Sequence, residues 1–257
     1  MPDAHANTID AFRLDGLHAV VTGASRGLGE GCALALAGAG ADVTVVGRTQ
    51  ADLETVAGNI RALGRNAEII AADVTDIDLF ADRLNELSSV DIFVNNAGTN
   101  KPQPFLSVDP DTYDTVMNVN LRAAFFAAQA AARLMVDAGK GGSIINMTSQ
   151  AGHRALRDRS VYSSTKFGLE GLTKAMAFEL AEHEIRVNAV APTFVETPLA
   201  KQFLANPDFR DYVENKIRLP RLGQVGDVAA AVLYLASPAA AMVTGTSLLV
   251  DGGWTIH

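Results

Sequence analysis

Residues 22–29 read Thr22-Gly23-Ala24-Ser25-Arg26-Gly27-Leu28-Gly29 and lie between a short β-branched run and an apolar helical pattern. A glycine-rich turn between a strand and a helix lets the backbone bend sharply and lets a pyrophosphate approach the helix N-terminus. The glycine spacing differs from the G-x-G-x-x-G pattern, and such a turn can also serve packing alone. The stretch therefore favours a dinucleotide site at the start of an α/β sheet, with support needed from residues further along.

The rest of the chain alternates short apolar runs with helical patterns. Strands are predicted over residues 18–22, 42–46, 67–71, 91–95, 143–148, 185–190 and 247–250. Helices are predicted over residues 27–39, 50–63, 76–87, 110–138, 161–182 and 225–236. Such alternation implies parallel strands joined by right-handed crossovers. We expect one α/β domain over residues 1–257, a doubly wound, Rossmann-like seven-stranded parallel sheet with helices on both faces.

The segment 194–222 interrupts this alternation. It contains Pro198, Pro207 and Pro220 among charged and amphipathic stretches. It also follows a predicted strand at the edge of the sheet where such folds bind ligands. We interpret it as a mobile cover over a substrate site, with a helical insertion for packing or subunit contact as an equal alternative.

Composition limits the partners that are expected. The chain has 257 residues, 48% of them hydrophobic, which suits one large core. Its formal net charge of −8 argues against nucleic acid as a partner. Cys32 is the single cysteine, which excludes an internal disulfide and a cysteine-rich metal site, and no metal is predicted. The sequence shows neither a signal-peptide pattern nor a long apolar run, so we expect a soluble, cytoplasmic protein without a membrane partner.

A second informative stretch is Ser160-Val161-Tyr162-Ser163-Ser164-Thr165-Lys166. One helical turn separates the phenol of Tyr162 from the ammonium of Lys166 and puts both on one helix face. The pair can act as an acid–base catalyst if the cation lowers the phenol pKa of about 10. The same spacing also occurs on ordinary helix surfaces, so the pair needs support from other motifs.

Four further motifs complete a recognisable set. Asp73-Val74 follows the third predicted strand, Asn95-Asn96-Ala97-Gly98 follows the fourth, Ser149 follows the fifth, and Asn120 lies in Met117-Asn118-Val119-Asn120. With these motifs, residues 14–254 resemble the short-chain dehydrogenase/reductase family in its compact type. The resemblance implies an enzyme that moves a hydride between a nicotinamide cofactor and the carbon of an alcohol or ketone.

The resemblance implies that Asn120, Ser149, Tyr162 and Lys166 are the catalytic residues. Tyr162 would exchange a proton with the substrate oxygen, and Ser149 would hydrogen-bond the same oxygen. Lys166 would hold the nicotinamide ribose and lower the pKa of Tyr162, while Asn120 would bind a water that relays protons. Taken singly, Ser149 could be a strand-end cap, Asn120 a competitor for helix hydrogen bonds and Lys166 a surface charge.

The resemblance also implies where a cofactor binds. The glycine turn would hold the adenosine phosphates, Asp73 would meet the adenine, and the asparagine-rich turn would line the nicotinamide. The segment Ala191-Pro192-Thr193-Phe194-Val195-Glu196-Thr197 would bind the carboxamide, with Thr193 in place of the usual glycine. The implied cofactor residues are Gly23, Ser25, Arg26, Gly27, Leu28, Gly29, Arg48, Thr49, Asp73, Val74, Asn96, Ala97, Gly98, Tyr162, Lys166, Pro192, Thr193, Val195 and Thr197.

The choice of cofactor depends on the end of the second predicted strand. This end reads Val46-Gly47-Arg48-Thr49 and carries no carboxylate for the diol of the adenosine ribose. A guanidinium suits the 2′-phosphate of NADP, and both Arg48 and Arg26 are placed to supply one. We therefore expect NADP(H) in preference to NAD(H). The alternative is that Arg48 is only solvated and that NAD is accepted.

Substrate contacts are predicted at Gln150, His153 and Arg154. They belong to a loop in which His153, Arg154, Arg157 and Arg159 oppose Asp158, a pattern that suits a carboxylate but more often marks a solvated surface. The chain resembles bacterial family members that act on sugars, sugar acids or polyols, so we expect a small-molecule substrate of this kind.

Two other functions stay open. One is a 3-oxoacyl carrier-protein reductase, which is weakened by Phe178 at a position where such relatives tend to carry a base. The other is a non-catalytic nicotinamide-binding sensor or scaffold. The stretch from Gly245 to Trp254 resembles a segment that packs across a tetramer interface in many relatives. A homotetramer is therefore expected, with Trp254 as an interface anchor or, less favoured, a lid over a site.

Overall fold

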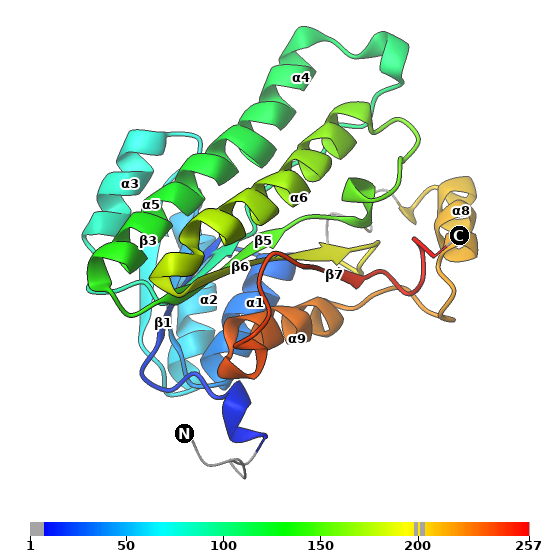
Figure 1. Ribbon diagram of the computed structural model, residues 1–257. Helices are drawn as coiled ribbons and strands as arrows, with labels where there is room; N and C mark the ends of the chain where they lie inside the picture. The colour runs from blue at the N-terminus through cyan, green and yellow to red at the C-terminus, as the bar shows by residue number, and fades with distance from the viewer. Residues whose placement is uncertain (1–7, 198–199, 201–203, 257) are drawn as a thin grey trace.

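A computed structural model describes residues 8–197, 200 and 204–256. Seven strands form one parallel sheet in the order β3-β2-β1-β4-β5-β6-β7 (Figure 1). The strands are β1 His18–Thr22, β2 Asp42–Gly47, β3 Ala67–Ala71, β4 Ile92–Asn95, β5 Gly142–Met147, β6 Ile185–Pro192 and β7 Ser247–Val250. The order reverses between β1 and β4, where open α/β sheets bind ligands at the strands' carboxyl ends. The predicted doubly wound, seven-stranded fold is confirmed.

Helices cover both faces of the sheet (Figure 1). On one face lie α1 Gly27–Gly38, α2 Gln50–Ala62 and α9 Val225–Ala236; on the other lie α3 Ile77–Asn85, α4 Pro110–Met117, α5 Ala124–Ala138 and α6 Ser160–Leu180. Short helical turns occur at η1 Asp10–Phe12, η2 Phe105–Ser107, η4 Gln150–Gly152, η5 Ala181–His183 and η6 Pro238–Ala240. Within the described residues, no helix combines the length and the apolar character needed to span a membrane.

The helix predicted over residues 110–138 is not continuous. A π-helical segment, η3 Asn118–Ala123, separates α4 from α5. Asn120 lies in this segment, and its amide exchanges two hydrogen bonds with the backbone of Thr99, at 2.7 and 2.8 Å. Single π turns inside helices often occur at functional sites. The prediction of one uninterrupted helix is therefore wrong, because a tertiary contact changes the local winding.

The strands are nearly continuous apolar runs in the sequence because both faces of the sheet are buried under helices. Neighbouring residues of β1 point to opposite faces, so that Val21 packs under α1 and α9 while Val20 packs under α5. Both side chains are fully buried. Cys32 is buried on the α1 side, and this burial raises the pKa of its thiol to about 12.

The segment after β6 forms a small apolar cluster of its own. It contains α8 Pro207–Lys216, and its Phe194 ring lies 5.5 Å from Phe209 and 5.6 Å from Trp254, measured between ring centroids. Trp254 is 4% exposed, so its ring is buried within the subunit and the favoured role as an interface anchor is wrong. Residues 198–199 and 201–203 of the expected cover lie outside the described residues.

Candidate active site

The glycine turn between β1 and α1 has the shape that close approach of a phosphate group needs. Gly23 and Gly27 both have φ of +64°, a conformation that favours glycine. A Cβ on Gly29 would lie 2.2 Å from the carbonyl oxygen of Gly23, so no larger residue fits there. Because α1 begins at Gly27, its first backbone N–H groups face this turn. The residues present fit the pyrophosphate of a dinucleotide.

The end of β4 is tied to the glycine turn. The Thr22 hydroxyl accepts hydrogen bonds from the backbone N–H groups of Asn96 and Ala97, at 2.9 and 3.0 Å. The Asn96 amide donates to the Thr22 carbonyl at 2.9 Å. Asn95 is buried instead and donates to the Ala124 carbonyl at the start of α5. These hydrogen bonds fix the carboxyl ends of β1 and β4 relative to each other, and a cofactor can bind across them.

A pair of hydroxyl groups marks the centre of the site. Ser149 follows β5 and is buried, and its hydroxyl lies close enough to that of Tyr162, in the first turn of α6, to oppose the rise in the phenol pKa. Ser149 also accepts from the Ala151 backbone N–H at 3.1 Å and donates to Gln150 at 2.7 Å. The backbone turn and Gln150 thus hold the Ser149 hydroxyl in place beside Tyr162.

Lys166 lies one helical turn beyond Tyr162. Its side chain is 5% exposed, its Nζ donates to the Met147 carbonyl at 2.8 Å, and it stands 5.5 Å from the centroid of the Tyr162 ring. Burial lowers the pKa of Lys166 to about 8, an effect that nearby Glu170 opposes.

The pKa of Tyr162 shifts in the direction opposite to the prediction. Burial raises it, and the hydrogen bond from Ser149 and the positive charge of Arg159 offset this only in part. The predicted lowering by Lys166 is therefore wrong for this arrangement. The ammonium lies over the ring and bonds the Met147 carbonyl, so desolvation of the phenolate decides the direction.

Asn120 joins three parts of the site. Besides its bonds to Thr99, its amide lies 3.3 Å from the Thr165 hydroxyl on α6, and the residue is fully buried. Gly98 lies beside it, where an added Cβ would stand 3.4 Å from Asn120 Oδ1 and 4.0 Å from Lys166 Nζ. The structure thus gathers the four predicted catalytic residues from the loop after β5, from α6 and from η3.

The residues expected to contact the adenosine half of the cofactor are more exposed to solvent than the catalytic residues. Arg26 and Arg48 are exposed, and neither forms a salt bridge with another residue of the described part. The Ala24 N–H donates to the Val46 carbonyl at 3.0 Å, which holds the glycine turn beside the end of β2. Asp73 accepts from the Thr75 N–H and hydroxyl, so one of its oxygens caps a turn.

The segment after β6 reaches back to the glycine turn. A Cβ on Gly27 would lie 3.6 Å from the Thr197 methyl, which places Thr197 above the turn. The Thr193 hydroxyl oxygen is buried and has no hydrogen-bond partner among the described residues. A buried polar atom without a partner is costly, and the hydroxyl fits a ligand amide at this position.

The three predicted substrate residues lie in different surroundings. Gln150 is buried against Ser149. His153 Nε2 lies 3.1 Å from both Glu170 Oε1 and Ser247 Oγ, and the Arg154 guanidinium donates to the Thr255 carbonyl at 3.3 Å. The structure therefore brings only Gln150 into contact with Ser149. His153 contacts α6 and β7, and Arg154 contacts the C-terminal segment.

Arg159 was named in the sequence only as one of the charges of a loop that suits a carboxylate, and no substrate contact was assigned to it individually. It lies three residues before Tyr162, and the structure buries it close enough for its charge to act on the Tyr162 hydroxyl. Its guanidinium carbon stands 5.6 Å from the centroid of the Phe209 ring on α8. The signal was a basic residue at the start of the helix that carries the phenol.

Comparison with known proteins agrees with this geometry. A family model described as enoyl-(acyl carrier protein) reductase matches residues 23–255. The chain belongs to the short-chain dehydrogenase/reductase family, and it is an NAD(P)-dependent oxidoreductase that interconverts an alcohol and a ketone.

Individual relatives are similar over nearly the whole chain. L-xylulose reductase of Mesocricetus auratus is 42% identical over 243 residues, covering 95% of this chain and 98% of that protein. The structure of a gluconate 5-dehydrogenase from Burkholderia cenocepacia J2315 in complex with NADP and tartrate has a TM-score of 0.94 and 34% identity, covering 98% of this chain and 100% of the other. A carveol dehydrogenase from Mycobacterium avium in complex with NAD has a TM-score of 0.90 and 29% identity, covering 95% and 99%.

Proposed function

We propose that this enzyme interconverts a secondary alcohol and a ketone of a sugar, sugar acid or polyol, with Tyr162 as the acid–base catalyst. The observation that carries the proposal is the half-buried phenol of Tyr162 between the buried side chains of Ser149 and Lys166. The substrate class is supported by the names of similar proteins, an L-xylulose reductase and a gluconate 5-dehydrogenase.

Each catalytic side chain has a distinct task in this proposal. Bound nicotinamide supplies or accepts the hydride at the substrate carbon. During reduction Tyr162 Oη gives its proton to the substrate oxygen, and the Ser149 hydroxyl hydrogen-bonds the same oxygen as negative charge develops there. Because burial raises the pKa of Tyr162, the phenol keeps its proton at neutral pH. In the oxidative direction it must first lose that proton, so oxidation is expected to speed up as the pH rises.

The cofactor is proposed to lie along the carboxyl ends of β1 and β4. The backbone N–H groups at Gly27–Gly29 would bind the pyrophosphate, and Asp73 and Val74 would border the adenine. Lys166 would hold the nicotinamide ribose, and the unpartnered Thr193 hydroxyl would meet the carboxamide. Asn120 is proposed to act by positioning the loop at Thr99 and by binding a relay water.

NADP(H) is the proposed preferred form. Arg48 directly follows β2, and Arg26 belongs to the glycine turn that is hydrogen-bonded to the end of that strand; both residues are exposed, and a guanidinium suits a 2′-phosphate. The similar gluconate 5-dehydrogenase binds NADP and the similar carveol dehydrogenase binds NAD, so the arginines are what favours the phosphate here.

The segment 194–222 is proposed to cover the substrate site within one domain. The position of Thr197 next to Gly27 and the contact of Arg159 with Phe209 support this role, because the first brings the segment to the glycine turn and the second to the start of α6.

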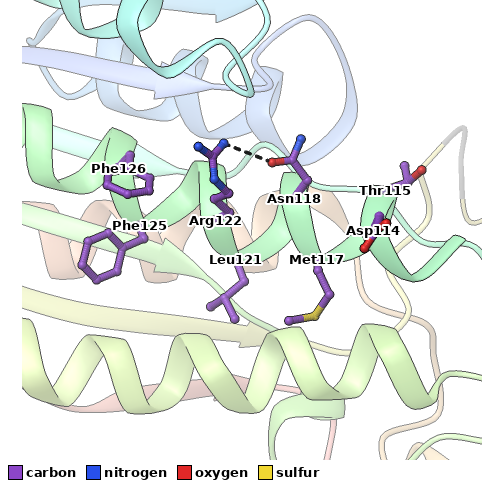
Figure 2. A pocket seen from close by; sticks show the side chains of 8 residues that line it. All are labelled: Asp114, Thr115, Met117, Asn118, Leu121, Arg122, Phe125 and Phe126. Carbon is purple, nitrogen blue, oxygen red and sulfur yellow. Dashed lines mark hydrogen bonds between the residues drawn. The ribbon is translucent and has the colours of Figure 1, made fainter. Parts of the chain in front are cut away.

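A second copy of this chain is proposed to pack on the face formed by α4, η3, α5 and α6. An open groove of about 830 Å³ lies on this face. Met117, Leu121 and Phe125 are among the side chains that line it (Figure 2). Tyr113, Phe167 and Phe178 add exposed aromatic rings on α4 and α6. A run of exposed apolar side chains on neighbouring helices is a feature of protein interfaces and supports the proposed homotetramer.

Tyr162→Phe tests the catalytic assignment. The substitution keeps the ring and removes the proton source, so kcat should fall by about 10²- to 10⁴-fold while NADPH affinity changes little. Tyr113→Phe, on the exposed surface of α4, is the matched control and should leave both values unchanged. Turnover is followed by NADPH absorbance and binding by NADPH fluorescence. Near-normal turnover of Tyr162→Phe would refute the assigned role.

A substrate panel tests the reaction against its alternatives. Ketoses, sugar acids and diketones should be reduced, and acyl thioesters should not. Turnover confined to acyl thioesters would favour the carrier-protein reductase that Phe178 weakens, and NADPH binding without any turnover would favour a sensor.

A further inference from the structure

Arg159 occupies a position that the catalytic proposal does not use. It is the N-cap residue of α6, its side chain is 7% exposed, and the Phe209 ring holds its guanidinium on the side of the cover. A phenyl ring accepts no ordinary hydrogen bond, and of the five guanidinium N–H donors one at Nη1 is directed at the Arg157 carbonyl, at 3.4 Å. The positive charge therefore lies between the catalytic phenol and the covering segment.

The backbone around Arg159 is held firmly. The Gln103 N–H donates to the Asp158 carbonyl at 2.9 Å, and the Ser163 N–H donates to the Arg159 carbonyl at 2.8 Å. Asp158 has φ of +58°, a left-handed conformation that is unfavourable for a non-glycine residue. Strained backbone of this kind persists where surrounding contacts enforce it, and Arg159 follows it directly at the start of α6.

The Arg159 guanidinium differs from that of Arg157 in the same loop because it is buried. The Arg157 side chain is 89% exposed, whereas Arg159 is buried, and burial lowers the pKa of Arg159 although Asp158 and Tyr162 oppose the shift. An arginine nevertheless stays protonated at neutral pH. A buried cation next to a reaction centre, in a chain of net charge −8, attracts an anionic group of a ligand selectively.

We propose that Arg159 binds a carboxylate of the substrate, so that the enzyme acts on keto-aldonic acids and aldonates in preference to neutral ketoses and polyols. A guanidinium and a carboxylate pair through two parallel hydrogen bonds, which fixes orientation as well as charge. This inference rests on the proposed function and narrows its substrate class. Arg159 is a specificity residue, since the proton and hydride transfers do not pass through it.

The test compares 5-keto-D-gluconate with L-sorbose, which differ only in carrying a carboxylate or a CH₂OH group at one end. The wild type should show at least about tenfold higher kcat/KM for the keto acid. Arg159→Gln should lower kcat/KM for the keto acid by about 10- to 100-fold and change that for L-sorbose less than about threefold. Arg159→Lys should retain part of the preference, and Arg157→Gln, the exposed control, should retain all of it. Equal kcat/KM for the two substrates in the wild type, or an equal loss on both in Arg159→Gln, would overturn the proposal.

A binding measurement separates this inference from the proposed function. Tartrate and threitol share a four-carbon hydroxylated chain, and only tartrate has carboxylates. With NADPH present, tartrate should raise the melting temperature of the wild type more than threitol does, and Arg159→Gln should lose that difference while still binding NADPH. If no sugar or sugar acid is turned over, the proposed function fails, and the tartrate result still decides the role of Arg159. An equal effect of the two compounds on the wild type refutes it.

Discussion

Lys166→Met is predicted to make the stability of this protein less dependent on pH in the alkaline range. The amine of Lys166 has an ordinary pKa of 10.5, and burial lowers it to about 8 in the folded chain. Below pH 8 both the folded and the unfolded chain carry the charge, so the folded state bears the whole cost of burying it. At 1.36 kcal/mol for each pH unit between the two pKa values, this cost is about 3 kcal/mol.

The sign of the pH effect follows from the order of the two pKa values. Between pH 8 and pH 10.5 the folded chain has released the proton and the unfolded chain still holds it, so wild-type stability rises with pH. Methionine keeps an unbranched side chain and carries no charge. The variant also loses the hydrogen bond to the Met147 carbonyl, but that loss is independent of pH. The stability of the variant relative to the wild type should therefore fall by about 2.5 kcal/mol from pH 7 to pH 10.

The assay is urea unfolding of both proteins at the two pH values, without cofactor and at one protein concentration. Lys174→Met is the control, because Lys174 is exposed on the same helix and its replacement removes a charge without relieving burial. A relative stability of Lys166→Met that changes by less than about 0.5 kcal/mol between the two pH values would refute the burial argument. The variant is also expected to lose turnover.

Three further changes test other parts of the structure. Arg48→Asp should lower the ratio of kcat/KM with NADP to that with NAD by at least about tenfold, since it replaces attraction of the 2′-phosphate by repulsion; an unchanged ratio would show that the phosphate contact is misplaced. Phe167→Glu should reduce the sedimentation mass from that of a tetramer, four times 27.0 kDa, while Leu63→Glu on the opposite face should not; a mass insensitive to Phe167→Glu would remove α6 from the interface. Gly29→Ala should abolish NADPH binding or folding because its Cβ meets the Gly23 carbonyl, whereas Gly58→Ala, with open space around it, should stabilise α2 by about 0.5–1 kcal/mol; equal melting temperatures would contradict the close approach at Gly29.

The catalytic set and most of the elements could be predicted from the sequence. Strand β1, for example, has the predicted limits, because a strand between a loop and a glycine turn is set by its own apolar residues and by the turn. The relation of Tyr162 to Lys166 is likewise local, since one helical turn separates them. Joint occurrence of the motifs indicated the family, since the glycine turn, Asp73, Asn96 and Ser149 each follow a strand at one edge of the sheet and the Tyr162–Lys166 pair lies on the helix after the fifth strand.

Burial and long-range contact could not be predicted in this way. The π segment at Asn120 depends on a hydrogen bond with Thr99, which lies on another element. From the sequence Trp254 is expected at an interface or over a site, whereas in the structure it packs against Phe194 of the segment 194–222. Likewise, the sequence does not distinguish Arg159 from the other charged residues of its loop, and its contact with Phe209 appears only in the structure.

Short-range pattern therefore determined the succession of strands and helices, the phosphate turn and the Ser149, Tyr162 and Lys166 set. The order of the strands in the sheet, the direction of the Tyr162 pKa and the placement of Arg159 beside the phenol were decided only in the folded chain. The physical reason is that propensity and periodicity act between residues a few positions apart. Desolvation and electrostatic attraction depend instead on which distant residues packing brings together.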